Sequence, residues 1–159
     1  MVGTETRRRV RWEYKTKVRG LNPEETQKEF TRIQWRQFDG GIFSLFPPPG
    51  IKEEGDANGV GCVRIVPFEQ LPIMEEEILD VTPGEEIVYT VNKGPFPVYY
   101  HRGYVTFEPT GSNSTLVKWA VEVEPYPYCE TILKYLVMWI FTSGLQGLKN
   151  GARKPKKDN

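Results

Sequence analysis

The sequence predicts one α+β domain in which a curved antiparallel sheet closes over a long C-terminal helix. Three observations lead to this prediction: an alternating segment at residues 10–18, a series of strand-like segments between residues 60 and 124, and an apolar helical segment from Cys129 to about Lys149. A chain of 159 residues fits one hydrophobic core, whereas two independent cores would be cramped.

The N-terminal part predicts one strand followed by two short helices. Residues 10–18 alternate between apolar and charged side chains, which is typical of a strand with one buried face. The segment Asn22-Pro23-Glu24-Glu25 then has the features of a helix start, with Asn as the N-cap, Pro at the first helical position and acidic residues in the first turn. Gly40-Gly41 ends this helical part. Ile42–Phe46 could form a short strand, which the prolines at 47–49 must end because they cannot donate to a ladder.

Five strand-like segments follow, separated by short turn signals such as Pro83-Gly84 and Gly94-Pro95. They cover residues 60–67, 73–82, 86–93, 99–108 and 115–124. Because the connections are short, neighbouring strands are expected to form antiparallel hairpins. With the two earlier segments, the predicted sheet has about seven strands.

The C-terminal helix is apolar nearly all round at its centre, from Tyr135 to Phe141. A helix with one buried stripe would carry polar residues opposite, so we expect the sheet to enclose most of its girth or a partner to cover the remainder. The run is far shorter than the roughly 20 residues that a bilayer span needs, which predicts no stable membrane insertion. Gly144 and Gly147 are expected to weaken the end of the helix. Residues 1–7 and 151–159 are expected to be flexible, so that the domain covers 8–150.

The composition argues against several classes of protein. Basic and acidic residues number 21 each, so no net charge draws the protein to nucleic acid. Two cysteines, Cys62 and Cys129, make no disulfide framework, and a single histidine excludes a histidine-rich metal site. The first nine residues lack the apolar segment of a secretory signal, which predicts a cytoplasmic protein. No metal or other cofactor is expected.

Several local motifs are similar to those of a known family. They are Gly59-Val60-Gly61-Cys62-Val63-Arg64, Glu76 with Ile78, Pro83-Gly84-Glu85-Glu86-Ile87-Val88-Tyr89, and Phe107-Glu108-Pro109-Thr110-Gly111 before Thr115-Leu116-Val117-Lys118-Trp119. With the order of elements, they resemble the START-like superfamily, and within it the polyketide cyclase/dehydrase-like branch, over residues 8–150. This resemblance implies the helix-grip fold. Its motifs are structural rather than catalytic, and the proline-rich stretch at 47–49 departs from the pattern.

The resemblance also implies a cavity between the concave face of the sheet and the long helix, in which family members hold lipids, sterols, polyketides or similar ligands. Such sites are mostly apolar hollows with a few polar groups. The candidate ligand-binding residues are Trp12, Tyr14, Tyr89, His101, Phe107 and Trp119 from the sheet and Trp139 from the helix. Ligand access is expected through the loops Phe43–Ile51 and Gly94–Val98.

Four further features have a structural interpretation, and the first two of them also have a functional one. His101 is favoured as a hydrogen-bonded core or pocket residue, although its unperturbed pKa of about 6.5 would suit catalytic proton transfer. Arg64 and Glu76 are favoured as a solvent-exposed ion pair on neighbouring strands over a buried polar handle that orients a ligand. The glycine-rich segment 55–61 is interpreted as a hairpin turn, because it lacks the Gly-Lys-Ser/Thr of a phosphate loop. Cys62 is interpreted as an inert small residue.

The sequence therefore favours a non-enzymatic carrier or binding protein for a hydrophobic small molecule. An enzyme similar to polyketide cyclases and aromatases, which would use the same cavity, stays open as an alternative. So does a protein-interaction module that uses the exposed part of the C-terminal helix, including a homodimer through that helix.

Overall fold

The computed structural model describes residues 7–37 and 45–152. In this part of the chain a helical segment follows the first strand, six strands come next, and one long helix ends the order. The strands are β1 (Val10–Arg19), β2 (Gly50–Glu53), β3 (Val63–Phe68), β4 (Leu71–Thr82), β5 (Glu86–Lys93), β6 (Val98–Gly111) and β7 (Ser114–Pro125). The helices are α1 (Pro23–Phe30), the π-helical η1 (Thr31–Gln37) and α2 (Glu130–Gly151).

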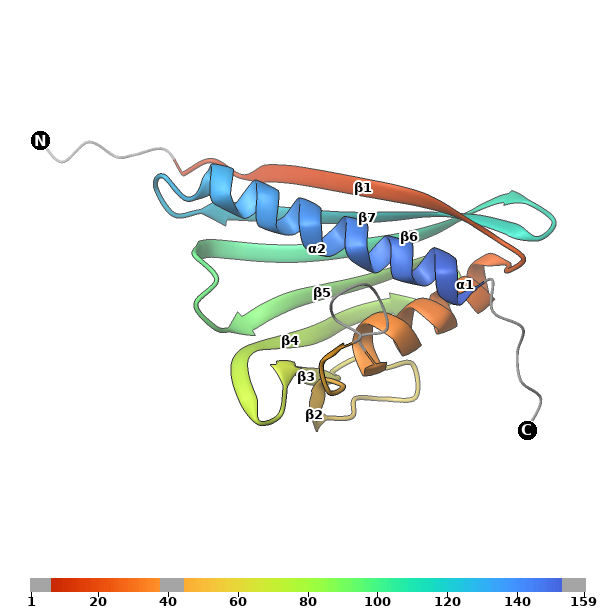
Figure 1. The fold of residues 1–159 in the computed structure, drawn as a ribbon, viewed down its shortest axis with the longest axis horizontal. Helices are drawn as coiled ribbons and strands as arrows, with labels where there is room; N and C mark the ends of the chain where they lie inside the picture. Colours follow the sequence, from red (N-terminus) through yellow and green to blue (C-terminus); the bar gives the residue numbers. More distant parts are fainter. Residues whose placement is uncertain (1–6, 38–44, 153–159) are drawn as a thin grey trace, which may run out of the picture.

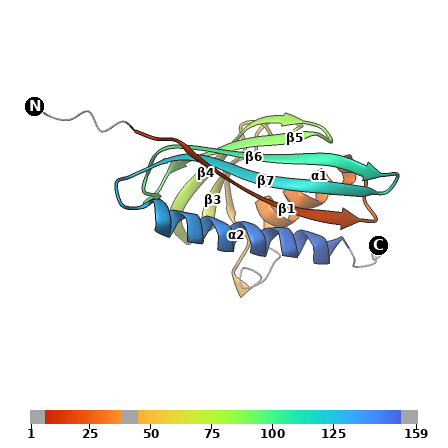
Figure 2. The ribbon, with the colours of Figure 1, turned by 90° about the horizontal axis from the view of Figure 1, so that it is seen from above.

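The strands form one antiparallel sheet of the order β1-β7-β6-β5-β4-β3-β2. The chain crosses from β1 to the far edge and returns by hairpins, so that β1 pairs with β7 along its whole length, from Val10↔Val123 to Arg19↔Ser114. Figures 1 and 2 show the sheet curving around one side of the molecule, with α2 running along its concave face. The predicted α+β class and curved antiparallel sheet are confirmed.

The start of α1 follows from its capping residues. Asn22 Oδ1 accepts a hydrogen bond from the Glu25 backbone N–H at 2.9 Å, and the Glu25 carboxylate accepts one from the Asn22 N–H at 3.0 Å. This reciprocal capping box satisfies two backbone donors that the first turn leaves open. The two predicted short helices are contiguous, because Thr31 keeps right-handed helical dihedral angles and α1 continues directly into η1.

Strand β2 lies after the prolines at 47–49, pairing Gly50 with Ile65 of β3. The sequence predicted a strand before these prolines instead, at Ile42–Phe46, most of which lies outside the described residues. The predicted turn at 55–61 is confirmed, since Asp56 Oδ1 accepts hydrogen bonds from the backbone N–H groups of Asn58 and Val60.

Helix α2 buries one stripe rather than its whole girth. Its buried large side chains recur every three or four residues and face the sheet: Leu133, Val137, Phe141, Leu145 and Leu148. The opposite side of its first three turns is exposed and also apolar. Of the two arrangements expected for this helix, enclosure of most of its girth by the sheet is not observed, because α2 rests on the sheet beside β1 and β7 and its outer side faces away (Figure 2). Cover of the outer side by a partner stays a prediction. Within the described ranges, no helix combines the length and hydrophobicity that crossing a membrane requires.

Gly144 was expected to weaken α2, but it permits the closest packing between α2 and the rest of the core. A Cβ at this position would lie 2.6 Å from the Trp119 ring and 2.9 Å from Gln34 Oε1. Trp119 stacks on Phe141 with ring centroids 4.1 Å apart. The absent side chain therefore lets the indole and the amide approach the helix backbone.

The substitution Gly144→Ala is expected to lower the free energy of unfolding by about 1–3 kcal/mol, because overpacking a dense core costs this much. Helix propensity alone predicts the opposite sign, a gain of up to about 1 kcal/mol for alanine over glycine. Urea unfolding followed by circular dichroism measures the change. Gln146→Ala, at an exposed position one half-turn on, serves as the control and is expected to stay within about 0.5 kcal/mol of the parent.

Candidate ligand-binding cavity

A cavity of about 100 Å³ lies between the concave face of the sheet and α2. Apolar and aromatic side chains supply most of its wall: Val66, Met74, Val91, Phe96, Val121, Val137, Ile140 and Phe141. The polar or amphipathic residues that line it are Gln34, Arg64, Glu76, Tyr89, His101 and Trp119. An apolar hollow with a few convergent polar groups is the usual form of a small-molecule site.

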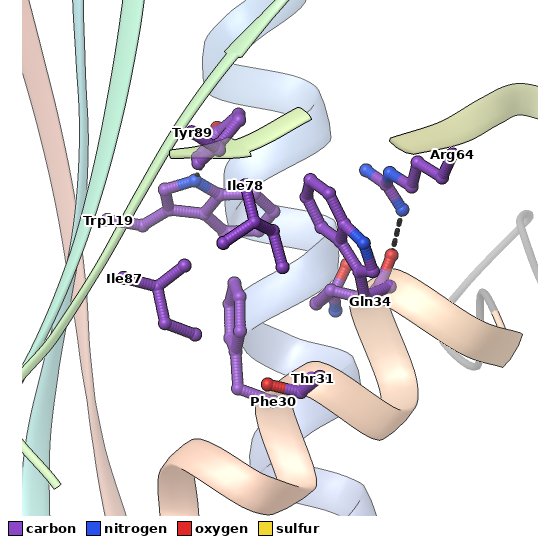
Figure 3. Close-up of a pocket in the computed structure, with 9 residues that line it drawn as sticks. Phe30, Thr31, Gln34, Arg64, Ile78, Ile87, Tyr89 and Trp119 are labelled. Atoms are coloured by element: carbon purple, nitrogen blue, oxygen red, sulfur yellow. Dashed lines mark hydrogen bonds between the residues drawn. The ribbon is translucent and has the colours of Figure 1, made fainter. Parts of the chain in front are cut away.

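A second, tighter hollow of about 10 Å³ adjoins this cavity and shares Gln34, Arg64, Tyr89 and Trp119 with it. Figure 3 shows Phe30 reaching from the helical segment toward Trp119, and the hydrogen bond that joins Arg64 to Gln34. The Phe30 ring meets Trp119 edge-on, with centroids 5.1 Å apart. This hollow has room for one water molecule at most, so the larger cavity is the candidate site.

Tyr89 and Trp119 form a buried polar pair on the wall of the cavity. Trp119 Nε1 donates a hydrogen bond to Tyr89 Oη at 2.8 Å. Burial, and then the negative charge of Glu76, raises the pKa of Tyr89 far above its ordinary value, so the phenol stays protonated. Gly103 lies beneath the ring, where a Cβ would overlap it. The hydroxyl thus accepts from Trp119 and keeps its own proton as a donor.

Arg64 and Glu76 form an ion pair that is buried, with only 6% and 7% of each residue exposed. They are directly paired across β3 and β4, and Arg64 Nε donates to Glu76 Oε2 at 2.6 Å. Arg64 Nη1 also donates to the main-chain carbonyl oxygen of Gln34, and the guanidinium lies 4.3 Å from the centre of the Trp35 ring. The favoured interpretation of a solvent-exposed pair is therefore wrong, because η1 covers this part of the sheet.

His101 is also buried, at the point where β5 and β6 separate. The ladder between these strands ends at Tyr89↔Gly103. Beyond it, the Val91 N–H donates to His101 Nδ1 at 3.2 Å and the Thr90 hydroxyl donates to the His101 carbonyl oxygen at 2.8 Å. Burial, and then the nearby charge of Arg102, lowers the pKa of His101 from 6.5 to about 4. The imidazole is neutral at pH 7, and Nε2 carries its proton because Nδ1 accepts.

The structure brings together five of the predicted site residues, since Arg64, Glu76, Tyr89, His101 and Trp119 all line the cavity. The other four predicted residues do not line it. Trp12, Tyr14 and Phe107 belong to or pack against the core, and Trp139 lies on the outward side of α2 with 47% of its surface exposed.

Packing explains why these core residues lie outside the cavity wall. Tyr14 meets Phe141 edge-on at 6.0 Å between centroids, and Phe107 meets Phe30 in the same way at 5.9 Å. Strand alternation placed both on the concave face correctly, but side chains from the helices fill the space above them.

Gln34 is the residue of this site that the sequence did not reveal. Its side-chain Nε2 donates to the Gly144 carbonyl oxygen at 2.8 Å, and its main-chain carbonyl oxygen accepts from Arg64. A glutamine in a short helix carries no local signal for such a bridge between η1, α2 and β3. Cys62 agrees with its interpretation as a small core residue, since it is buried and its Sγ accepts from Trp35 Nε1 at 3.3 Å.

Of the two loops expected to give ligand access, the one at 94–98 contributes Phe96 to the cavity wall. The Phe96 ring meets His101 edge-on at 5.6 Å. The other loop, Phe43–Ile51, lies partly outside the described residues.

No family model and no curated protein matches the sequence. Solved structures do match. XoxI from Bacillus cereus is 17% identical with a TM-score of 0.68, over 94% of this chain and 99% of the other. A protein from Thermobifida fusca is 16% identical with a TM-score of 0.71, over 94% and 97%.

A truncated norcoclaurine synthase from Thalictrum flavum is 17% identical with a TM-score of 0.68, over 98% of this chain and 100% of the other. Another structure of that synthase contains dopamine and hydroxybenzaldehyde. At such low identity the likeness shows the fold alone. Together with the seven-stranded antiparallel sheet and the long α2, it establishes that this chain has the α+β helix-grip fold.

Proposed function

We propose that this protein is a cytoplasmic carrier or binding protein for a small, mainly apolar molecule, which it holds in the cavity between the sheet and α2. The observation that carries the proposal is a hollow in an otherwise dense core that is apolar over most of its wall yet lined by a buried ion pair, a phenol and a neutral imidazole. These groups already have protein partners, but the Tyr89 hydroxyl keeps its own proton as a donor after it has accepted from Trp119. A ligand with one polar end would accept a hydrogen bond from it.

The volume of the cavity limits the size of the ligand. An engineered apolar cavity of about 150 Å³ holds benzene, whereas sites for drug-sized ligands measure about 300–1,000 Å³. At about 100 Å³ the cavity is smaller than both, so it fits the end of a chain as it stands, and one small ring requires a slight expansion of its wall. A whole sterol or lipid, as members of the START-like superfamily hold, would require its wall to move.

The polar groups suggest how the ligand is oriented. The Tyr89 hydroxyl retains a donor after it has accepted from Trp119, so it suits a hydroxyl or carbonyl oxygen on the ligand. Apolar burial supplies the affinity, at about 25 cal/mol per Å². A single-ring compound with one oxygen substituent combines both features. The dopamine and hydroxybenzaldehyde in the norcoclaurine synthase structure are also single-ring compounds, although each carries two oxygen substituents.

Cavity-filling and cavity-enlarging substitutions test the proposal. Isothermal titration calorimetry with phenol as the probe is expected to show 1:1 binding, which Val121→Phe weakens at least about tenfold because it fills the hollow. Met74→Ala, which enlarges the same hollow, is expected to favour the larger probe indole over phenol. Leu116→Phe, next to Val117 and half-buried on the other face of β7, is the matched control and should leave both affinities unchanged.

Native mass spectrometry of the purified protein tests for a ligand that co-purifies. The proposal fails if no added mass is found and neither probe binds. It also fails if Val121→Phe binds phenol as tightly as the parent while circular dichroism shows that it is folded.

A second candidate is an enzyme of the polyketide cyclase/dehydrase-like branch, with His101 as the proton-transfer group. A neutral histidine on the cavity wall favours it. The hydrogen bond from Val91 occupies the Nδ1 lone pair, however, so His101 would accept a substrate proton only after that bond had broken. The arrangement therefore supports binding better than catalysis, and an enzyme would require His101→Ala to abolish turnover rather than only change affinity.

A further inference from the structure

The outward side of α2 carries large apolar side chains in its first three turns. Ile132 is 72% exposed, Tyr135 is 62% exposed, and Leu136 and Trp139 are exposed by 39% and 47%. Figure 2 shows one side of α2 against the sheet and the other facing away from it, and the exposed fractions place these residues on the outward side. A cluster of half-exposed aromatic and aliphatic residues marks an interaction surface rather than ordinary surface composition.

These four residues are symmetrically spaced along the helix, and Met138, which is also 39% exposed, lies to one side of them, roughly 100° round the helix axis from Trp139. The intervals are three residues, one residue and three residues, so the pattern is unchanged when it is reversed about the midpoint between Tyr135 and Leu136. The next outward positions, Ser143, Gln146 and Asn150, are polar and end the apolar stripe. When two copies of this helix lie antiparallel, each residue of the stripe therefore lies opposite a stripe residue of the other copy.

We propose that a second copy of this chain covers the stripe, with the two α2 helices antiparallel across a two-fold axis. A two-fold interface uses the same patch on both copies and pairs residue i with residue j and j with i. Here Ile132 faces the partner's Trp139, and Tyr135 faces the partner's Leu136. The four seam positions carry no charge, and the chain has no net charge, so the two copies meet without like-charge repulsion.

Tyr128 extends this surface just before α2 begins. It is 99% exposed and has a φ of 66°, a left-handed conformation that bulky residues rarely adopt. A fully exposed tyrosine in this conformation has a role once the partner's helix lies beside it.

The surface area that the interface would bury determines the expected affinity of the dimer. Two aromatic rings, the aliphatic residues beside them and part of Tyr128 offer on the order of 600 Å² per copy, or about 1,200 Å² in total, which is the lower end for specific interfaces. We therefore expect a reversible dimer that forms in the micromolar range. An anionic membrane surface fits less well, because Arg7 and Arg8 near the start of α2 lie 3.8 and 3.7 Å from Glu124 and Glu130, which offset their charge.

Sedimentation equilibrium of the full chain tests this interface with a charge pair designed for its register. The mass of the parent is expected to double as the concentration rises through the micromolar range. Tyr135→Lys and Leu136→Glu are each expected to weaken the dimer at least about tenfold, because each places an unpaired charge in the seam. The double variant should recover that loss, because lysine then faces glutamate twice across the two-fold axis, and added salt should weaken only the double variant.

Since both positions are exposed, circular dichroism should be the same for all four proteins. A parent that stays monomeric at every concentration would overturn the proposal. So would a double variant that remains as monomeric as the single variants, because the contact would then have no defined register. If the monomer instead binds vesicles that contain phosphatidylserine and does not self-associate, the surface docks on membranes and the dimer is wrong. None of these outcomes depends on whether the cavity holds a ligand.

Discussion

Glu76→Leu is expected to lower the free energy of unfolding by about 3–5 kcal/mol, because removing one partner of a buried ion pair leaves the other charge uncompensated in the core. In the variant Arg64 would keep its bond to the Gln34 main-chain carbonyl and its place over the Trp35 ring. Neither of these neutral groups replaces a carboxylate 2.6 Å from Nε.

The double variant Arg64→Met with Glu76→Leu separates the cost of an unpaired charge from the value of the pair. Apolar side chains of similar volume can replace a buried pair at little cost or with a gain, so the double variant should be clearly more stable than Glu76→Leu alone. Chemical denaturation monitored by tryptophan fluorescence measures all three proteins. Equal stability of the single and double variants would show that water reaches the pair in solution.

An exposed pair on the same sheet provides the matched control. Lys118 Nζ lies 2.5 Å from Glu108 Oε1, on neighbouring strands and with both side chains partly exposed to solvent. Glu108→Ala is expected to cost less than about 1 kcal/mol, because water screens a surface pair and solvates the charge that remains. The shortest N···O distance is 2.5 Å in both pairs, so the contrast with Glu76 tests the effect of burial.

The burial of Glu76 is a feature that the sequence alone could not predict. The run Glu75-Glu76-Glu77 places an acid on either face of β4, so alternation alone could not choose a face. In the structure Glu75 pairs with Lys52 and Lys93 at the surface, whereas Glu76 points to the concave side. Selecting the inward acid requires knowing where η1 lies, which depends on contacts distant in sequence.

The long helix shows a related limit. Its length and position were predictable, because a continuous apolar stretch between a proline-rich turn and the C-terminus has few alternatives. Its orientation was not, since Leu133, Val137 and Phe141 face the core while Ile132, Tyr135 and Trp139 face outward, and both sets are apolar. A hydrophobic period identifies a buried face only when the other face is polar. This is why Trp139 was assigned to the cavity and lies outside it.

The stability of the protein is expected to fall between pH 6.5 and pH 4 through His101. The folded state holds the pKa of this histidine at about 4, while the unfolded chain has the ordinary value of 6.5. Between these values the unfolded chain binds a proton that the folded protein excludes, so unfolding is favoured as the pH decreases. At 1.36 kcal/mol per pKa unit, the loss reaches about 3 kcal/mol near pH 4 and does not grow further below it.

A variant that stays neutral isolates this contribution from that of the carboxylates, which also titrate in acid. His101→Gln keeps a side-chain oxygen that can accept from the Val91 N–H and has no proton to gain. The difference in unfolding free energy between the parent and this variant is expected to be constant above pH 7. By pH 4 the parent should have lost about 3 kcal/mol of stability relative to the variant. A difference that does not change with pH would mean that the imidazole titrates alike in the folded and unfolded states.

Because His101 is the only histidine, its ring resonances identify themselves, and an NMR titration measures its pKa directly. A midpoint near 4 would agree with an imidazole enclosed between Phe96, Tyr89 and the Val91 amide. Protonation must then break the Val91 hydrogen bond and place a charge on the cavity wall, so loss of a bound apolar ligand should follow the same midpoint. A midpoint near 6.5 would instead indicate that solvent reaches the ring, which would then not form part of the cavity wall.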